Sequence, residues 1–167
     1  MRDLDANRVR EVFAFDPSTG VFTYRTQTAH HRKVGDIAGT ITAQGYRDIG
    51  IDSRVYKAHR LAWFYMHGQW PMHQIDHING DRADNRIANL RDVTKTVNLQ
   101  NQKRAHSNSA HGFLGVRIES RWGDSPRYLA RITVNGVRRS LGSFDTAEEA
   151  HAAYLNAKRA EHPGCTI

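Results

Sequence analysis

Cysteine and long apolar runs are the two features that this sequence most clearly lacks. Cys165 is the single cysteine, so no disulfide can form within the chain and a zinc site built from cysteines is excluded. The apolar runs are far shorter than a membrane span, and the first residues of the chain contain no apolar signal core. We therefore expect a soluble cytoplasmic protein with no structural zinc and no membrane partner.

Acidic residues are also in short supply. The 167 residues include 17 Asp and Glu against 24 Lys and Arg, which gives a formal net charge of +7 and a pI near 9.9. This excess of positive charge favours a polyanion as partner, because Lys and Arg neutralise phosphates. The length allows one ordinary domain or two small ones.

Residues 74–101 are unusually rich in side chains that bind a hard cation or transfer a proton. These side chains are Asp76, His77, Asn79, Asp81, Asp84, Asn85, Asn89, Asn98 and Asn101. The Asn79-Gly80 pair is a strong turn signal. The apolar pattern around it predicts a strand at 74–77, a long loop, a strand at 90–93 and a helix at 94–104.

Two oxygen donors from this stretch could share one cation. If the second strand and the helix pack on the first strand, the Asn98 amide oxygen would come beside the Asp76 carboxylate. A shell of oxygen donors suits Mg²⁺ or Mn²⁺ better than Zn²⁺. His77 would take a proton from water, because its ordinary pKa is near neutral. Asn89 could tie the loop to the first strand and orient His77.

These residues carry a family resemblance. The pattern of Asp76-His77, Asn89-Leu90 and Asn98, with HRLAWFYMHG at 59–68 and IDHINGDRADNRIANLR at 75–91, resembles phage-type homing or free-standing endonucleases of the His-Asn-His (HNH) family, in the variant with Asn at the third position. The resemblance implies a ββα-metal core over 74–104 that cuts one DNA strand per active site. It implies catalytic roles for His77 and Asn89, one Mg²⁺ or Mn²⁺ on Asp76 and Asn98, and a phage-infected bacterial cell as the setting.

The residues before this stretch are expected to form a small antiparallel sheet with two helices. Helical spacing covers 4–13, and strands are predicted at 21–25, 37–42, 46–51 and 54–57. A second helix is expected over 58–67, with Gly68 as its end. His59 lies at the start of this helix, where it would either cap the helix or reach the metal site.

A polar, basic segment without periodicity follows the predicted metal site. We interpret 103–111 as a linker that lies on DNA, between a nuclease domain at 1–102 and a second domain at 112–167. The overall fold class is therefore α+β.

The second domain is expected to be a three-stranded sheet packed on one helix. Strands are predicted at 114–120 and 128–134, and Asn135-Gly136 is typical of a two-residue hairpin turn. The expected register pairs Val134 with Val137, and four further pairs follow: Thr133 with Arg138, Ile132 with Arg139, Arg131 with Ser140, and Ala130 with Leu141. A helix after Asp145 carries an alanine stripe that would cover the apolar face, which leaves an arginine-bearing face uncovered.

This second domain resembles the AP2 family of DNA-binding domains. The matching segments are GFLGVR at 112–117 and LGSFDTAEEAHAAY at 141–154, with the hairpin between them. The resemblance implies a sheet laid into the major groove of double-stranded DNA. The residues expected to bind DNA, in the linker and on the sheet, are Lys103, Arg104, Gly115, Arg117, Arg131, Thr133, Arg138 and Ser140.

The sequence thus favours a metal-dependent DNA endonuclease with a site preference. One metal site per chain predicts that a monomer nicks one strand, and that a double-strand break needs two chains. The alternative is a sequence-specific DNA-binding protein that keeps an inactive nuclease fold, and an enzyme directed at RNA is a third possibility.

Overall fold

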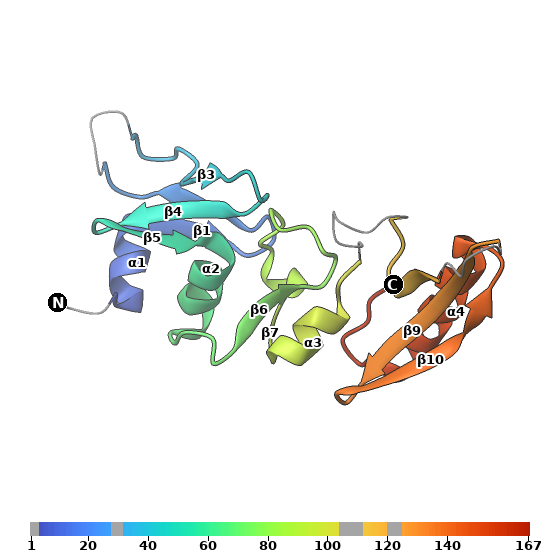
Figure 1. Cartoon of the computed structure of the whole chain (residues 1–167). Coiled ribbons are helices and arrows are strands. Elements are labelled where there is room, and N and C mark those ends of the chain that lie inside the picture. Colours follow the sequence, from blue (N-terminus) through green and yellow to red (C-terminus); the bar gives the residue numbers. More distant parts are fainter. Residues whose placement is uncertain (1–3, 28–31, 104–111, 120–124) are drawn as a thin grey trace. The chain divides into compact units, whose positions relative to one another are not determined.

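The computed structural model describes residues 4–27, 32–103, 112–119 and 125–167, and it is an α+β structure of small antiparallel sheets and helices (Figure 1). The chain divides into two compact units, Met1–Lys95 and Thr96–Ile167. Within the described ranges, no helix has both the length and the apolar character needed to cross a bilayer. His30, His31 and most of the predicted linker lie outside the described residues.

The first unit opens with a short helix that leads directly into a hairpin. Helix α1 (Ala6–Val12) begins after Asp5, whose carboxylate accepts from the Asn7 N–H at 3.1 Å. The helix ends one residue earlier than the expected 4–13, because Phe13 has the extended backbone that starts β1 (Phe13–Asp16). Strand β1 pairs with β2 (Val21–Tyr24) across the turn at 17–20.

A three-stranded sheet follows, and it leads into α2. Its strands are β3 (Thr40–Ile41), β4 (Arg47–Ile51) and β5 (Arg54–Lys57), in that spatial order. Strand β3 is shorter than the expected 37–42 because Ile37 forms a bridge with Thr23 instead. Helix α2 (Ala58–His67) has the predicted bounds, and Gly68 ends it in the left-handed conformation.

Aromatic and branched side chains from these elements form the core of the first unit. Val9, Phe13, Phe22, Ile49 and Leu61 are each 0% exposed. The Phe13 and Phe22 rings meet edge to face with centroids 5.9 Å apart. Burial of each such side chain contributes about 1.5–3 kcal/mol, so this core is a firm support for the strands that follow it.

The polar stretch forms a further hairpin and then a helix. Strand β6 (Gln74–His77) pairs antiparallel with β7 (Leu90–Val93), and the short 3₁₀ helix η1 (Ile87–Asn89) precedes β7. Helix α3 (Lys95–Gln100) is shorter than the expected 94–104. Its end tightens because the N–H groups of Asn101 and Gln102 donate three residues back, to Asn98 and Leu99.

The second unit contains the predicted three-stranded sheet. Its strands β8 (Val116–Glu119), β9 (Arg127–Val134) and β10 (Val137–Phe144) lie in the order β10-β9-β8. Asn135 and Gly136 both have positive φ, at 51° and 79°, as the predicted hairpin turn requires. The register is confirmed for its first four pairs. The fifth is wrong, because a bulge at Leu141 pairs Ala130 with Gly142.

Helix α4 (Ala147–Glu161) covers one face of this sheet (Figure 1). Thr146 and Glu149 form a reciprocal capping box at its start. Ala147 and Ala150 are buried on the helix, and Ala130 and Ile132 are buried on β9. Small alanines let the helix lie close to the strands, so the predicted apolar stripe is confirmed.

Candidate functional site

The β6–β7 hairpin places Asp76 and His77 together at the end of β6. Asp76 lies opposite Arg91 and His77 lies opposite Leu90. Both polar side chains are buried, with 6% and 5% of their surface exposed. Buried polar groups need partners, because an unpaired one costs about 1–3 kcal/mol. The contacts of these two residues therefore define what the site can do.

His77 is buried among polar and aromatic groups rather than in an apolar interior. Its Nε2 lies 3.2 Å from the Asn85 amide oxygen. Its ring centroid lies 5.0 Å from that of His59 and 6.2 Å from that of Tyr46. Burial lowers the pKa of His77, while the Asn85 hydrogen bond and the Asp76 charge oppose that shift. The ring is therefore neutral near pH 7, as a proton acceptor must be.

His59 is a second neutral imidazole beside His77. It lies in the first turn of α2, is 8% exposed, and packs its ring 5.3 Å from Tyr46. Burial is the main cause that lowers its pKa to about 3, and the neighbouring His77 adds to the shift. Among the described residues its Nδ1 has no hydrogen-bond partner. His59 thus lies beside His77, and a role for it at a metal site stays a prediction.

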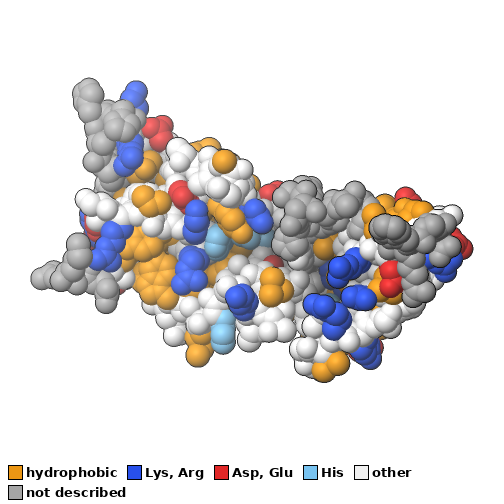
Figure 2. Space-filling view, viewed as in Figure 1, with side chains coloured by type: hydrophobic (Ala, Val, Ile, Leu, Met, Phe, Trp, Pro, Cys, Tyr) orange, Lys and Arg blue, Asp and Glu red, His pale blue; other side chains and the backbone are white. Residues whose placement is uncertain are grey.

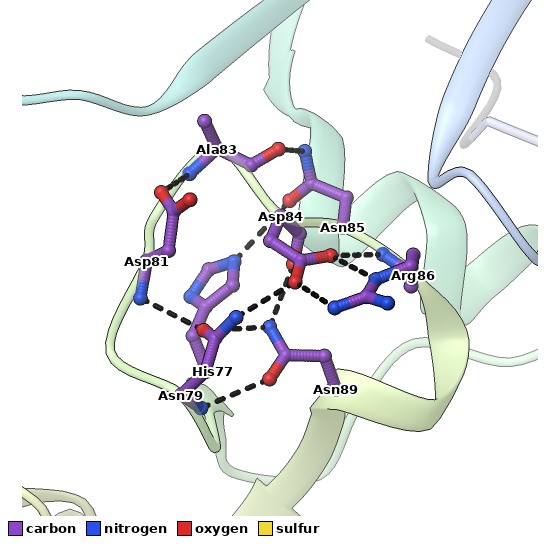
Figure 3. Close-up of polar contacts among 8 residues, drawn as sticks. All are labelled: His77, Asn79, Asp81, Ala83, Asp84, Asn85, Arg86 and Asn89. Carbon is purple, nitrogen blue, oxygen red and sulfur yellow. Dashed lines mark hydrogen bonds and ion pairs between the residues drawn. The ribbon is translucent and has the colours of Figure 1, made fainter.

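The loop at 78–89 is held by a series of side-chain to backbone hydrogen bonds (Figure 3). The N–H of Asp81 donates to Asn79 Oδ1 at 2.8 Å, and the N–H of Ala83 donates to Asp81 Oδ1 at 2.9 Å. Such Asx turns replace regular secondary structure. The many Asn and Asp residues of the loop therefore have a structural role of their own.

The Asn89 side chain joins the start of this loop to its middle. Its Oδ1 accepts from the Asn79 N–H at 2.9 Å, and its Nδ2 donates to the Asp84 carbonyl at 2.8 Å. Asn89 is 7% exposed, so these bonds are shielded from water. The amide that contacts the His77 ring is that of Asn85, so the orienting role of Asn89 stays a prediction.

Asp84 and Arg86 close the loop on its outer side. Arg86 donates from Nε at 2.8 Å and from Nη2 at 2.6 Å to the two Asp84 oxygens. The Arg86 hydrogen bond is the main cause that lowers the pKa of Asp84 to about 2. Asp84 is therefore a charged member of an ion pair, which accounts for it without a catalytic role.

Arg91 forms an ion pair with Asp76. Its Nε and Nη2 both donate to Asp76 Oδ2, at 2.8 Å and 2.7 Å. The pair follows from the strand register, because the two residues lie directly opposite each other on β6 and β7. The proposed metal ligand is therefore already paired with a cation in this structure.

The Asp76 carboxylate does not by itself make a complete metal site. Among residues 4–27, 32–103, 112–119 and 125–167, no three His, Cys, Asp or Glu side chains gather into a group that could hold a metal. Mg²⁺ does not need such a cage, since it commonly takes one or two protein carboxylates and fills its other positions with water and phosphate. A single Asp76 carboxylate is compatible with that chemistry.

Asn98, the other predicted ligand, belongs to α3 in the second unit, so its place beside Asp76 stays a prediction. Within the second unit, α3 and the residues after it contact the end of the chain. Lys158 Nζ donates to the Gln102 carbonyl, Gly164 N–H donates to Gln100 Oε1 at 3.2 Å, and Thr166 bonds Asn101. Hydrogen bonds at the C-terminal end of α3 thus hold the segment that carries Asn98 to the last residues of the chain.

The residues predicted to bind DNA fall mainly on the sheet face opposite α4. Thr133 pairs with Arg138, and Arg131 pairs with Ser140, so the four side chains are cross-strand neighbours. Arg138 lies on the face opposite α4. Its neighbour Arg139 lies on the other face, where it pairs with Glu161 of α4. Lys and Arg side chains gather over this unit in Figure 2. Exposed members of the set are Arg117, Thr133, Arg138 and Ser140.

The remaining members of that set differ in kind. Lys103 and Arg131 are half-buried, and Arg104 lies outside the described residues. Gly115 has φ +73°, and a Cβ there would lie 2.0 Å from the Tyr154 ring of α4. That close contact is a packing reason for glycine at this position.

Sequence reasoning missed three residues of the site. In the sequence alone, Asn85 is one amide among many, Arg91 carries no signal without the β6–β7 register, and Tyr46 is only a strand residue. Tyr46 brings two cations close to His77, since Lys57 Nζ and Arg82 Cζ lie 5.5 Å and 4.9 Å from its ring centroid. Basic side chains also surround histidine on the face of the first unit drawn in Figure 2.

Comparison with known proteins finds a family match for part of the chain. No curated protein and no solved structure matches the chain. The family match that is found covers the end of β5, α2, β6, the loop, β7 and α3, and it does not reach the C-terminal sheet. Residues 56–100, which carry Asp76, His77, Asn89 and Asn98, match the HNH endonuclease family and so support a nuclease that acts on DNA.

Proposed function

We propose that this protein is a metal-dependent endonuclease that hydrolyses phosphodiester bonds of double-stranded DNA and, as a monomer, nicks one strand at preferred sites. The observation that carries the proposal is His77, a buried neutral imidazole held by an amide at the end of β6, inside the residues that match the HNH family. A double-strand break would need two chains, because the proposal gives each chain one metal site.

In this proposal each residue of the motif has one role. His77 is the general base, and Asn89 fixes the loop that surrounds it. Asp76 and Asn98 would hold one Mg²⁺ or Mn²⁺ through oxygen atoms. When bound, the cation would stabilise negative charge on the phosphate and on the leaving oxygen. The family match spans all four residues, which supports their common purpose.

The hydrolysis step transfers one proton to His77. An O–H bond of water breaks, its proton goes to the imidazole, and the water oxygen forms a bond to phosphorus. The bond between phosphorus and a deoxyribose oxygen breaks, and that oxygen leaves with the electron pair and is protonated by solvent. A positioned base of this kind contributes about 10²- to 10⁴-fold to the rate.

The C-terminal sheet is proposed to bind the DNA. Its outer face offers Arg131 and Arg138 for guanine edges or phosphates, and Thr133 and Ser140 for weaker polar contacts. Lys103, Arg104, Gly115 and Arg117 complete the proposed contact set. The net charge of +7 supports a polyanionic partner. An AP2-like mode of binding rests on the sequence resemblance.

A second candidate function is favoured by the Arg91–Asp76 ion pair. An arginine on the proposed metal ligand is what an inactive nuclease fold would retain, because the guanidinium takes the place of a cation. In that case the protein would recognise a DNA sequence without cutting it. The two functions predict the same DNA binding and opposite results in a cleavage assay.

Plasmid nicking separates these functions. Supercoiled DNA is incubated with the protein and Mg²⁺ or Mn²⁺, and the parent is compared with His77→Ala and with His73→Ala, a control at an exposed histidine. We expect nicking by the parent and the control, and a loss of at least about 100-fold in His77→Ala. Equal rates for all three would overturn the role of His77. Tight binding with no nicking by any of them would establish the second function.

A further inference from the structure

Asn85 is the most deeply buried amide of the loop, with 1% of its surface exposed. Its side chain lies between the His77 ring and the Ala83 carbonyl (Figure 3). Its Oδ1 is 3.2 Å from His77 Nε2, and its Nδ2 donates to the Ala83 carbonyl at 3.1 Å. Both ends of the amide are therefore engaged.

These two contacts determine where the proton of the His77 ring lies. The Ala83 carbonyl can only accept, so the NH₂ end of Asn85 must face it and the oxygen end must face His77. An amide oxygen has no proton to give, so His77 Nε2 must donate. In the neutral ring the other nitrogen, Nδ1, then carries the basic lone pair.

We propose that Asn85 is a positioning residue that holds His77 in the Nε2–H tautomer and makes Nδ1 the nitrogen that accepts the proton of water. This inference rests on the proposed role of His77 as general base. When Nδ1 takes the proton, Nε2–H still donates to the amide oxygen, so the ring keeps its orientation through the step. A ring free to take the other tautomer would present N–H to water and could not act as base.

The first hairpin braces Asn85 from outside the loop. Gly20 has φ +73°, and a Cβ at that position would lie 2.4 Å from both the Asn85 carbonyl carbon and the Arg86 nitrogen. The Ile87 N–H donates to the Pro17 carbonyl at 3.2 Å. The turn at 17–20 and the segment at 85–87 thus pack backbone to backbone, which leaves Asn85 little room to move.

Asn89 supports the same residue from inside the loop. Its Nδ2 donates to the carbonyl of Asp84, the residue immediately before Asn85. The effect that sequence reasoning gave to Asn89, the orientation of His77, is in this proposal passed on through Asn85. Loss of the Asn85 amide should affect the His77 ring directly, and loss of the Asn89 amide should affect it indirectly.

Nitrogen NMR of the ring tests the proposal without any cleavage assay. Protein labelled with ¹⁵N in histidine is recorded without metal or DNA at pH 8, and the His77 signals are assigned by their absence in His77→Gln. We expect one pyrrole-like Nε2 and one pyridine-like Nδ1 in the parent. Asn85→Ala should give a mixture of tautomers, whereas Asn85→Asp keeps an acceptor oxygen and should retain the parent pattern. Asn7→Ala, at an exposed residue of α1, is the control.

Cleavage provides the second measurement. We expect Asn85→Ala to lower kcat by about 10- to 100-fold with KM unchanged, and Asn85→Asp to restore part of the loss. A parent spectrum with the proton on Nδ1 would overturn the proposal, and so would an unchanged tautomer in a folded Asn85→Ala. If Asn85→Ala does not fold, the parent spectrum still decides, because a proton on Nδ1 overturns the proposal. A parent that shows the expected tautomer and cuts no DNA would refute the nuclease function and support the role of Asn85.

Discussion

The β6–β7 loop and the outer face of the C-terminal sheet are both polar, but the loop buries polar side chains and the sheet face exposes them. Asn85 and Asn89 are buried and bonded at both ends of their amides. Arg117 and Arg138 are exposed on their strands. Buried amides fix the position of a reacting group, whereas exposed arginines supply charge and reach. Changes in the loop should therefore alter the rate of cleavage, and changes on the sheet should alter affinity.

The largest effect is expected at Asp76. Asp76→Asn removes the proposed metal-binding charge while it keeps the shape of the side chain, so cleavage should fall by at least about 100-fold and DNA affinity should change little. Steady-state nicking and a binding titration measure the two effects. Asp52→Asn, at an exposed carboxylate paired with Arg8, is the control and should cut normally. A variant that keeps full activity would place the metal elsewhere.

The next effect concerns the sheet face. Arg131→Ala and Arg138→Ala should each weaken binding to the preferred site by about 5- to 150-fold, with kcat at saturating DNA unchanged. Arg139→Ala is a matched control, because Arg139 pairs with Glu161 instead. Binding is measured against specific and random DNA over a range of salt. Equal losses on both DNAs, with a flatter salt dependence, would make the arginine a phosphate contact. No loss on either would remove this face from the interface.

A smaller effect is expected on acid stability through His59. In the folded protein the pKa of His59 is lowered from 6.5 to about 3. The unfolded chain therefore binds the proton at a higher pH than the folded protein does, and the free energy of unfolding falls as the pH drops between these two values. His59→Gln should lose fewer degrees of Tm between pH 7 and pH 4.5 than the parent does. His73→Gln, at an exposed histidine, should behave as the parent. Identical Tm shifts in all three would mean that His59 is not the group responsible.

The smallest effect is expected at the cap of α4. Thr146→Ala removes the hydroxyl that accepts from the Glu149 N–H, and it should lower stability by about 1 kcal/mol without changing the rate of cleavage. Thr146→Ser keeps the hydroxyl and should leave Tm nearly unchanged. Thermal unfolding of the three proteins is the measurement. An equal loss in the alanine and serine variants would point to lost packing of the methyl group rather than to the cap.

Local patterns predicted the elements that frame the site. Strands 74–77 and 90–93 and helix 58–67 have the predicted bounds, because apolar spacing and turn residues mark them directly. The Asn135-Gly136 hairpin follows from the same kind of signal. The bulge at Leu141 does not, because the residue that leaves the ladder is chosen by packing across the whole sheet.

The contacts inside the site were harder to predict. Asp76 meets Arg91 only because of the β6–β7 register, and a loop as long as 78–89 does not set that register as a two-residue turn would. Asn85 is one of several amides in the sequence. Its position beside His77 depends on backbone packing against Gly20, which is distant along the chain. Such pairings are properties of tertiary structure, and the spacing of residue types does not contain them.

The bonds that join α3 to the end of the chain bear on how this protein can be taken apart for study. A fragment meant to hold the C-terminal sheet alone would, if started at 112, leave the backbone amide of Gly164 and the ammonium group of Lys158 without the acceptors that Gln100 and Gln102 provide. A fragment started near 96 keeps them. A tag fused after Ile167 should likewise be separated by a spacer, because Thr166 contributes to the attachment of the helix that carries Asn98.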